Sequence, residues 1–209
     1  MERIRIFDGK GNSIGTATRE EAHRKGLWHE TFSCWFICFK GDACYILLQH
    51  RSDNKENYPG LLDITAAGHL MENEKVSDGV REVKEELGIE IKFDELFSVG
   101  VIPSTIITEK VIDRELVHTY LYNCEIPLED FILQEEEVSG IVKGRFSDFE
   151  ALWLDKQMEM KVEGISYTNG NRRPLSKLVS KADFVQNELH YYKEVILGIR
   201  KYIANRKNL

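Results

Sequence analysis

An acidic segment between residues 68 and 89 limits the fold and chemistry of this chain of 209 residues more than any other stretch. Glu82, Glu85 and Glu86 are spaced so that a helix places their carboxylates on one face. The opposite face is apolar and consists of Val76, Val80, Val83 and Leu87. Such a stripe attaches a helix to a hydrophobic core, and Gly88 is suited to end the helix as its C-terminal cap. The segment therefore predicts an amphipathic helix that presents three carboxylates on its polar side.

The clustered carboxylates indicate a metal site. Like charges at this spacing repel one another, so an ordinary surface helix gains little from them. Carboxylate oxygens suit Mg²⁺ or Mn²⁺, which share their coordination shell with substrate phosphates. Arg81, at the start of the cluster, can hold a glutamate in place through charge-assisted hydrogen bonds. Taken by themselves, however, the glutamates fit a solvated acidic helix equally well.

The charge balance narrows the choice of ligand. The chain has 28 Lys and Arg residues against 35 Asp and Glu residues, a formal net charge of −7. This surplus of acid argues against a general nucleic-acid-binding protein, which usually carries a basic face. It allows a phosphorylated small molecule, because a metal ion can bridge two sets of anions. A hydrophobic content of 42% and a charged content of 30% fit a globular protein with a core.

The sequence predicts neither export nor a membrane span. The first residues lack the apolar run of a signal peptide, and the apolar stretch 34–39 is far too short to cross a bilayer. The four cysteines form no Cys-x-x-Cys pair, which indicates reduced thiols. We therefore expect a cytoplasmic protein that binds neither a membrane nor nucleic acid.

The remaining patterns predict strands and short helices in alternation. Polar–apolar alternation and turn residues predict an N-terminal hairpin, a central hairpin and three further strands, at residues 3–17, 32–49, 96–102, 115–125 and 140–145. Thr18 followed by Glu21 is a capping box that opens a short helix. Ser147 followed by Glu150 predicts a second helix with the same kind of cap.

From about residue 183 the apolar residues follow the heptad-like spacing of a long helix. The stripe consists of Val185, Leu189, Tyr192, Ile196, Ile199 and Ile203. We interpret it as a terminal helix packed on its own domain, and the alternative is the seam of a homodimer. No internal repeat or low-complexity linker occurs, so we predict one domain with a helical C-terminal extension.

The acidic segment as a whole resembles the Nudix box, whose pattern is G-x5-E-x7-R-E-U-x-E-E-x-G-U with U an apolar residue. Gly68 and Glu74 match its first part, and residues 81–89, Arg-Glu-Val-Lys-Glu-Glu-Leu-Gly-Ile, match its second part throughout. One departure occurs, because only six residues separate Glu74 from Arg81 where the pattern has seven. The position of Glu74 is therefore harder to predict than those of the glutamates on the helix.

This resemblance implies a Nudix-type α/β/α sandwich with a mixed β-sheet, in which a loop–helix–loop binds a divalent metal. We expect a Nudix hydrolase domain with the N-terminal hairpin over residues 1–165, and a helical C-terminal extension packed on it over residues 166–209. In that family the glutamates hold Mg²⁺ against a diphosphate and water attacks phosphorus. Glu82, Glu85 and Glu86 then act as metal ligands and catalytic residues, with Arg81 beside them.

A second resemblance, over roughly residues 1–150, is to the isopentenyl-diphosphate isomerase branch. It depends on residues 21–29, 32–36, 48–51, 58–60 and 68–69. The isomerases hold a separate metal through histidines and acidic residues, and the matching positions here are His23, His29, His69, Asp113 and Glu115. Three imidazoles with carboxylates suit a transition metal. The alternative is that the histidines are capping or core residues.

The same resemblance suggests roles for further residues. Arg51 and Lys55 correspond to basic residues that contact the diphosphate, and we assign both, with Gly68, to substrate binding. Glu115 is a candidate general base as well as a metal ligand. The acidic run 135–137 is an alternative base, or else a solvated loop.

Two observations separate a hydrolase from an isomerase. The isomerases use a cysteine directly before the Gly-His pair, where this chain has Ala67, which cannot transfer a proton. The isomerases also have a degraded Nudix box, whereas all three helix glutamates are present here. We therefore predict an isomerase-like Nudix hydrolase that uses Mg²⁺ or Mn²⁺ to cleave a nucleoside diphosphate derivative or a related small diphosphate. The alternatives are an isopentenyl-diphosphate isomerase and a non-hydrolytic nucleotide-sensing module.

Overall fold

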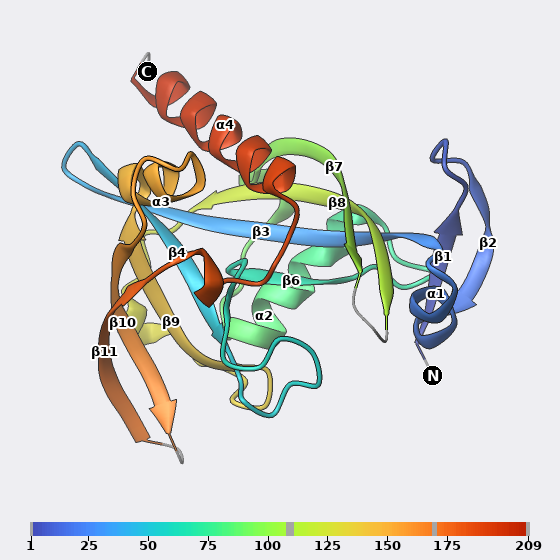
Figure 1. Cartoon of the computed structure of the whole chain (residues 1–209), viewed down its shortest axis with the longest axis horizontal. Helices are drawn as coiled ribbons and strands as arrows, with labels where there is room; N and C mark the ends of the chain where they lie inside the picture. Colours follow the sequence, from blue (N-terminus) through green and yellow to red (C-terminus); the bar gives the residue numbers. More distant parts are fainter. Residues whose placement is uncertain (1, 108–110, 169–170, 208–209) are drawn as a thin grey trace.

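The computed structural model describes residues 2–107, 111–168 and 171–207. Within these residues eleven strands form one sheet, and helices pack against its faces (Figure 1). The strands are β1 (Arg3–Phe7), β2 (Ser13–Thr18), β3 (Trp28–Lys40), β4 (Ala43–Arg51), β5 (Leu62–Asp63), β6 (Ala66–His69), β7 (Phe97–Ile107), β8 (Ile112–Asn123), β9 (Val138–Arg145), β10 (Met160–Thr168) and β11 (Asn171–Val179). The α-helices are α1 (Arg19–Lys25), α2 (Arg81–Leu87), α3 (Phe146–Trp153) and α4 (Leu189–Arg206). Short 3₁₀ turns are η1 (Val76–Val80), η2 (Phe93–Glu95), η3 (Leu128–Asp130) and η4 (Lys181–Asp183).

Strand β3 is the spine of the sheet, which runs in the order β11–β10–β9–β4–β3–β1–β2. Along one edge β3 pairs in parallel with β8, from Trp28 opposite Arg114 to Ile37 opposite Asn123. Its other edge is shared in turn by β1, β6 and β4, all antiparallel. The predicted mixed sheet is therefore confirmed, and β3 brings segments that are distant in sequence to neighbouring positions.

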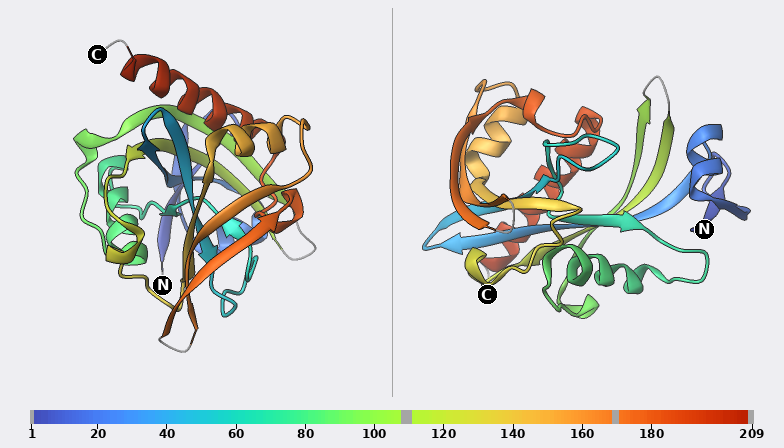
Figure 2. Two further views of the ribbon diagram at one scale, coloured as in Figure 1. Left: turned by 90° about the vertical axis from the view of Figure 1, so that its left-hand side faces the viewer. Right: turned by 90° about the horizontal axis from the view of Figure 1, so that it is seen from below.

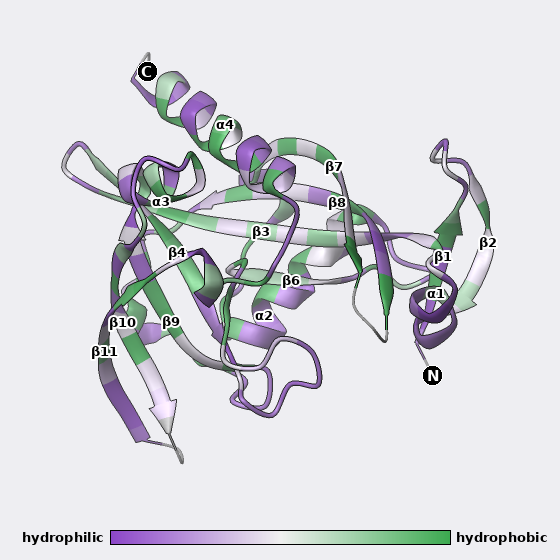
Figure 3. Ribbon diagram, in the orientation of Figure 1, coloured by the Kyte–Doolittle hydropathy of each residue, from purple (hydrophilic) through white to green (hydrophobic). Residues whose placement is uncertain are grey.

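Helices lie on both faces of the sheet (Figure 2). The core under α2 contains Val83 and Phe32, whereas the core under α3 and α4 contains Trp35, Trp153 and Tyr192. Hydrophobic residues concentrate along β3, β4 and β9, while α4 alternates between hydrophobic and hydrophilic residues (Figure 3). These two cores confirm the predicted α/β/α arrangement.

Most predicted elements occur where the patterns place them. Thr18 caps α1, and its Oγ1 accepts the backbone N–H of Glu21 at 3.1 Å. The helix expected from residue 76 begins as η1 and becomes α-helical at Arg81. Gly88 ends α2 in the left-handed region at φ 69°, a conformation that glycine adopts without strain.

The predicted cap at Ser147 is wrong. Helix α3 begins at Phe146 with Arg145 in the cap position, and the Ser147 hydroxyl donates to Asp148 Oδ1 at 3.1 Å. Phe146 and Phe149 are both buried and lie three residues apart, on one side of the helix. Core packing of these rings therefore sets the start of the helix.

The C-terminal part departs from the expected domain boundary. Residue 165 lies inside β10, and the residues that follow include β11 rather than a helix alone. Buried Met160 and Val162 alternate with exposed Lys161 and Glu163, which is the period-two pattern of a strand. Because β10 pairs with β9, the sheet continues across the expected boundary.

Helix α4 packs on its own domain. It begins at Leu189 instead of near residue 183, and Tyr192, Ile196 and Ile199 are buried. Leu189, at the start of the stripe, is 40% exposed. The stripe therefore faces the core for most of its length, whereas assembly into a homodimer stays a prediction.

The cysteines are free thiols, two of them buried and two half-buried. Burial raises the pKa of Cys44 to about 12 and that of Cys124 to about 11, so both thiols stay protonated. Among the helices in the described ranges, none is long and apolar enough to cross a membrane.

The aromatic cluster that joins α3 to α4 predicts a large contribution to stability. The Trp153 ring stacks on Tyr192 with centroids 3.5 Å apart, and Phe184 packs edge-on against both. We expect Trp153→Ala to lower the free energy of unfolding by about 3–5 kcal/mol, because it leaves a cavity in this cluster. Chemical denaturation measures the change. Met158→Ala, at a side chain that is 84% exposed, is the control and should change it little; a loss below about 1 kcal/mol for Trp153→Ala would contradict this account.

Candidate active site

Nearly all the site residues that were predicted from the sequence line one cavity of about 350 Å³. Those that line it are His23, Arg51, Lys55, Gly68, His69, Arg81, Glu82, Glu85, Glu86, Asp113 and Glu115. His29 is fully buried beside them. Residues from α1, α2, the four strands β3, β4, β6 and β8, and the loop that carries Lys55 thus meet at one place.

The register of β3 explains this convergence. His29 of β3 lies opposite Glu115 of β8, and Thr31 lies opposite His69 of β6. Residues that alternate along a strand, and their partners on neighbouring strands, project from the same face of the sheet. Helix α1 adds His23 from the preceding segment.

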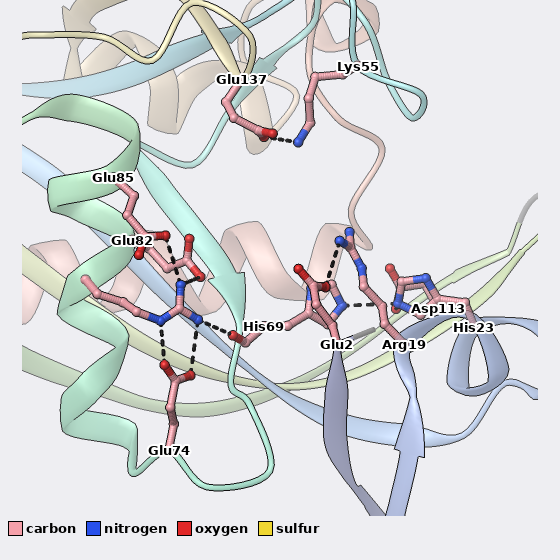
Figure 4. A network of polar contacts seen from close by, with 11 residues as sticks. Glu2, Arg19, His23, Lys55, His69, Glu74, Glu82, Glu85, Asp113 and Glu137 are labelled. Atoms are coloured by element: carbon pink, nitrogen blue, oxygen red, sulfur yellow. Dashed lines mark hydrogen bonds and ion pairs between the residues drawn. The ribbon is translucent and has the colours of Figure 1, made fainter.

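Arg81, the first residue of α2, contacts three carboxylates, those of Glu74, Glu82 and Glu85, which Figure 4 shows grouped at this helix. Its Nη1 lies 2.7 Å from Glu82 Oε1 and 3.0 Å from Glu85 Oε2. Its Nε and Nη2 donate to the two carboxylate oxygens of Glu74, at 2.5 and 3.1 Å, and Nη2 also donates to the His69 carbonyl at 3.0 Å. One guanidinium therefore orients three carboxylates and ties α2 to β6.

Glu74 reaches Arg81 although the stretch between them is one residue shorter than the Nudix pattern. The carboxylate also accepts the backbone N–H of Met71 at 2.8 Å. The hydrogen bond from Arg81 holds the pKa of Glu74 below its usual value. The intervening residues form η1, and a 3₁₀ turn rises about 2.0 Å per residue against 1.5 Å in an α-helix, so fewer residues span the same length.

Burial makes two of the helix carboxylates reluctant to ionise. It raises the pKa of Glu82 to about 7, against the opposing effect of Arg81. Burial, followed by the charge of Glu82, raises the pKa of Glu86 well above its usual value, and Glu86 Oε2 accepts the Ala67 N–H at 3.2 Å. Glu85 is more exposed and lies at the cavity. A divalent cation would offset the cost of the buried charges, so these oxygen donors fit Mg²⁺ or Mn²⁺.

Gly68 has a steric reason to be glycine. A Cβ at this position would lie 2.1 Å from Glu82 Oε1, well inside contact distance. The missing side chain lets β6 approach the acidic helix closely, and it leaves room in the cavity that Gly68 lines.

Three histidines form a compact cluster at the other end of the cavity. Each pair of ring centroids among His23, His29 and His69 is 5.1 Å apart. His23 Nε2 lies 3.1 Å from His69 Nε2, and Asp113 Oδ1 lies 3.6 Å from His23 Nε2. Burial lowers the pKa of all three imidazoles, which keeps them neutral and able to act as ligands.

The tautomer of His29 favours metal binding. Its Nδ1 lies 2.9 Å from the Leu27 carbonyl, which can only accept, so the proton is on Nδ1 and the lone pair is on Nε2. That Nε2 lies 3.4 Å from Asp113 Oδ1, and within the described residues neither atom has a hydrogen-bond partner. Two buried acceptors that face each other repel unless a cation lies between them. The ligand atoms of each possible set, the three histidines or His29 with Asp113 and Glu115, lie within 4.8 Å of one another, which fits a transition metal.

Two further carboxylates line the cavity, the half-buried Glu115 and the buried Asp63. Burial raises the pKa of Glu115 well above its usual value, and Asp113 and Asp63 raise it further. Burial also raises the pKa of Asp63, although Arg51 opposes that rise. Asp63 was not predicted as a site residue because it lies in an apolar run of the sequence. Its ion pair with Arg51 forms only in the fold.

The two predicted phosphate-binding cations are already paired. Arg51 donates to Asp63 Oδ2 at 2.7 Å and to the carbonyls of Tyr58 and Asn57 at 3.1 and 2.8 Å, so it orders the loop that carries Lys55. Lys55 forms an ion pair across the cavity with Glu137 (Figure 4). Of the acidic run 135–137, Glu137 therefore reaches the cavity.

Further residues of the cavity wall had no sequence signal. Arg19 of α1 lines the cavity and pairs with Glu2 at 3.4 Å. Val185 and Asn187, from the segment before α4, complete the wall. Only a three-dimensional arrangement brings these flanking segments to the acidic helix.

The chain belongs to the Nudix hydrolase family. Residues 27–165 match the NUDIX domain family. Over 200 residues the chain is 40% identical to an uncharacterized Nudix hydrolase of Clostridium acetobutylicum, a match that covers 95% of this chain and 97% of the relative. The family generally uses divalent metal cations, and its hydrolases act on small-molecule diphosphates.

A second relative and a solved structure agree with this assignment. An isopentenyl-diphosphate Delta-isomerase of Aliivibrio fischeri is 31% identical over 159 residues, which cover 71% of this chain and 83% of that protein. The fold is similar to that of a MutT/nudix family protein from Enterococcus faecalis, with a TM-score of 0.52 at 15% identity over 84% of this chain and 62% of that one. The predicted isomerase-like branch of the family is therefore confirmed.

The histidine cluster predicts metal-dependent stabilisation. We expect Zn²⁺ at about a hundredfold excess over its Kd to stabilise the protein by about 2.7 kcal/mol, because the ion binds the folded state only. The measurement is the melting temperature with and without Zn²⁺. His23→Ala should remove this shift and leave a Mg²⁺-induced shift in place. His190→Ala, at an exposed histidine on α4, is the control. An equal Zn²⁺ shift in His23→Ala would contradict a site made of the three histidines, and an equal shift in His29→Ala, which removes the imidazole common to both ligand sets, would contradict a metal site at the cluster.

Proposed function

We propose that this enzyme hydrolyses a diphosphate linkage in a small molecule, such as a nucleoside diphosphate derivative, with Mg²⁺ or Mn²⁺ held by Glu82, Glu85 and Glu86. The observation that carries the proposal is the meeting of these carboxylates with Lys55 at one cavity. When bound, the cation would neutralise phosphate oxygens and make a water molecule more acidic. The raised pKa values of Glu82 and Glu86 support it, since two buried carboxylates need a counter-charge.

The basic residues at the cavity would have separate roles in this reaction. Arg81 fixes the orientation of Glu82 and Glu85, which spares the site a rearrangement when substrate arrives. Lys55 exchanges Glu137 for a phosphate oxygen, and Arg51 keeps the Lys55 loop in place.

The proposed hydrolysis needs only the diphosphate and one water molecule. Water attacks one phosphorus, the bond from that phosphorus to the bridging oxygen breaks, and the bridging oxygen leaves with the other phosphate. A carboxylate takes the proton of the water, and Glu115 is our candidate. Glu137 is the alternative, because it also reaches the cavity.

Isomerisation is the weaker alternative. Ala67 lines the cavity, and its methyl group stands where the isomerases carry a cysteine. No proton can be transferred from that side chain. The complete set of helix glutamates favours hydrolysis, whereas a pure sensing module would not need it.

The net charge and the cysteines of the chain indicate the kind of substrate and the compartment of the enzyme. The net charge of −7 disfavours nucleic acid, and the free thiols fit a reducing compartment. We therefore propose that the enzyme acts in the cytoplasm. We propose that the histidine cluster binds a second, transition-metal ion at the other end of the cavity from the acidic helix.

Substitution of a helix glutamate tests the hydrolase directly. Glu85→Gln should lower kcat/KM by at least about a hundredfold, because a lost cation contributes several kcal/mol to transition-state stabilisation. A panel of nucleoside diphosphate derivatives and alkyl diphosphates, with phosphate release measured under Mg²⁺, provides the readout. Glu90→Gln is the matched control, since Glu90 follows the same helix but pairs with Lys84 at the surface. Full activity in Glu85→Gln would refute the site, and tight binding of a nucleotide without turnover would favour the sensing module.

Proton exchange tests the isomerase alternative. In heavy water with Mg²⁺ and Zn²⁺, we expect NMR to detect no enzyme-dependent deuterium in isopentenyl diphosphate, because Ala67 has no transferable proton. Deuterium at the allylic carbon would make isomerisation the better assignment.

A further inference from the structure

The N-terminal strand β1 lies outside the family match, which begins at residue 27, yet it contacts the loop that precedes the acidic helix. Ile4 forms a β-bridge with Met71, and the backbone N–H of Glu72 donates to the Arg3 carbonyl at 2.8 Å. The loop between β6 and η1 is thereby attached to β1. The stretch that lacks one residue of the Nudix pattern, residues 75–80, follows directly after this loop.

Arg5 makes the most specific of these contacts. Its Nη1 donates to the carbonyls of Glu72 and Glu74, at 3.2 and 2.5 Å. Its Nε and Nη2 donate to Glu30 Oε2 of β3, at 3.0 and 2.7 Å. The planar guanidinium therefore joins the spine of the sheet to two carbonyls of the loop, which a point charge such as lysine cannot do with the same geometry.

The anchor at Glu30 is itself held in place. Glu30 Oε1 lies 2.9 Å from His118 Nε2 on β8, and the Glu30 and Arg5 side chains are 14% and 26% exposed. Burial would raise the pKa of Glu30, but the hydrogen bonds of His118 and Arg5 hold it below its usual value. The pair is thus a half-buried ionic contact with several hydrogen bonds, unlike a solvated surface pair.

The far end of the loop leads to the acidic helix. The Glu74 carbonyl accepts from Arg5, while the Glu74 carboxylate accepts from Arg81 and from the Met71 N–H. Arg81 in turn contacts Glu82 and Glu85. Hydrogen bonds therefore link β3 to Glu74 through Arg5, and the Glu74 side chain continues the route through Arg81 to the carboxylates at the cavity.

We propose that Arg5 is a positioning residue for the cation site: it fixes the loop between β6 and η1 so that Glu74 and Arg81 hold Glu82 and Glu85 in their binding orientation. The inference rests on the proposed function, in which these glutamates bind the cation. Residues that orient metal ligands typically contribute about 10–100-fold to metal affinity. The N-terminal strand is then part of the catalytic apparatus although it contributes no ligand.

Calorimetric titration with Mg²⁺ alone tests the proposal. Mg²⁺ reports on the glutamates, because imidazoles are poor ligands for it. We expect Arg5→Met to raise the Kd for Mg²⁺ by about tenfold. Arg5→Lys should raise the Kd less, since lysine keeps the positive charge but lacks the planar guanidinium that contacts Glu30 and the loop at once. Arg3→Met is the matched control on the same strand, because the Arg3 side chain contacts the Glu72 carboxylate and neither loop carbonyl. Its Kd should equal that of the unsubstituted protein.

A double substitution identifies the route of the effect. If Arg5 acts through Glu74, then Arg5→Met added to Glu74→Gln should change the Kd by less than about twofold. A full additional loss in the Glu74→Gln background, or an unchanged Kd in folded Arg5→Met, would overturn the proposal. If Arg5→Met does not fold, as judged by its melting transition, Arg5→Lys decides, and an unchanged Kd there overturns the proposal too.

The same titration separates this proposal from the proposed function. Glu85→Gln should weaken Mg²⁺ binding whatever Arg5 does. If Glu85→Gln binds Mg²⁺ normally, the cation site itself is wrong. If Glu85→Gln loses binding while Arg5→Met keeps it, the cation site stands and only the role of Arg5 is refuted.

Discussion

The parallel pairing of β3 with β8 is the constraint on which the site depends. Side chains alternate between the two faces of a strand, so a slip of one residue would turn His29 or Glu115 away from the cavity. The apolar residues between the site positions prevent such a slip, because Phe32 and Phe36 must enter the core under α2. The same packing that stabilises the sheet therefore fixes the register of the proposed ligands. On β3, Phe32 and Phe36 pack in the core, whereas His29 and Thr31, on the other face of the strand, lie at the site.

The lining of the cavity has an excess of acidic over basic side chains. Among its described lining residues there are eight carboxylates and four lysines or arginines. Arg81 and Arg51 each have several acceptors and offset part of this charge, but burial still raises the pKa of Glu82, Glu86, Glu115 and Asp63. A site of this kind is costly to fold by itself and attractive to cations, and an anionic substrate can enter it only with them.

Local periodicity sufficed to predict the acidic helix, because Glu82, Glu85 and Glu86 and the apolar stripe all lie within three turns of chain. The histidine positions came from a resemblance, since nothing local links His23 to His69. Asp63 and Arg19 were not predicted, because their roles depend on partners brought together by the sheet. The β10–β11 pair was missed as well, and the cap at Ser147 was wrong, because tertiary packing outweighed a short local pattern.

The C-terminal segment extends this dependence on distant contacts. The Val185 N–H donates to the Leu62 carbonyl at 2.9 Å, beside Asp63, and Tyr191 contacts Ser33 and Trp35 through its hydroxyl at 3.0 and 3.2 Å. The segment is thus attached to the cavity wall, because Ser33 lines the cavity and Leu62 directly precedes the lining residue Asp63. A shortened protein limited to residues 27–165 would keep every helix glutamate yet lose His23 and one wall of the cavity. Under the proposed function, the smallest unit expected to be active is therefore larger than the family domain of residues 27–165 and includes both of its flanks.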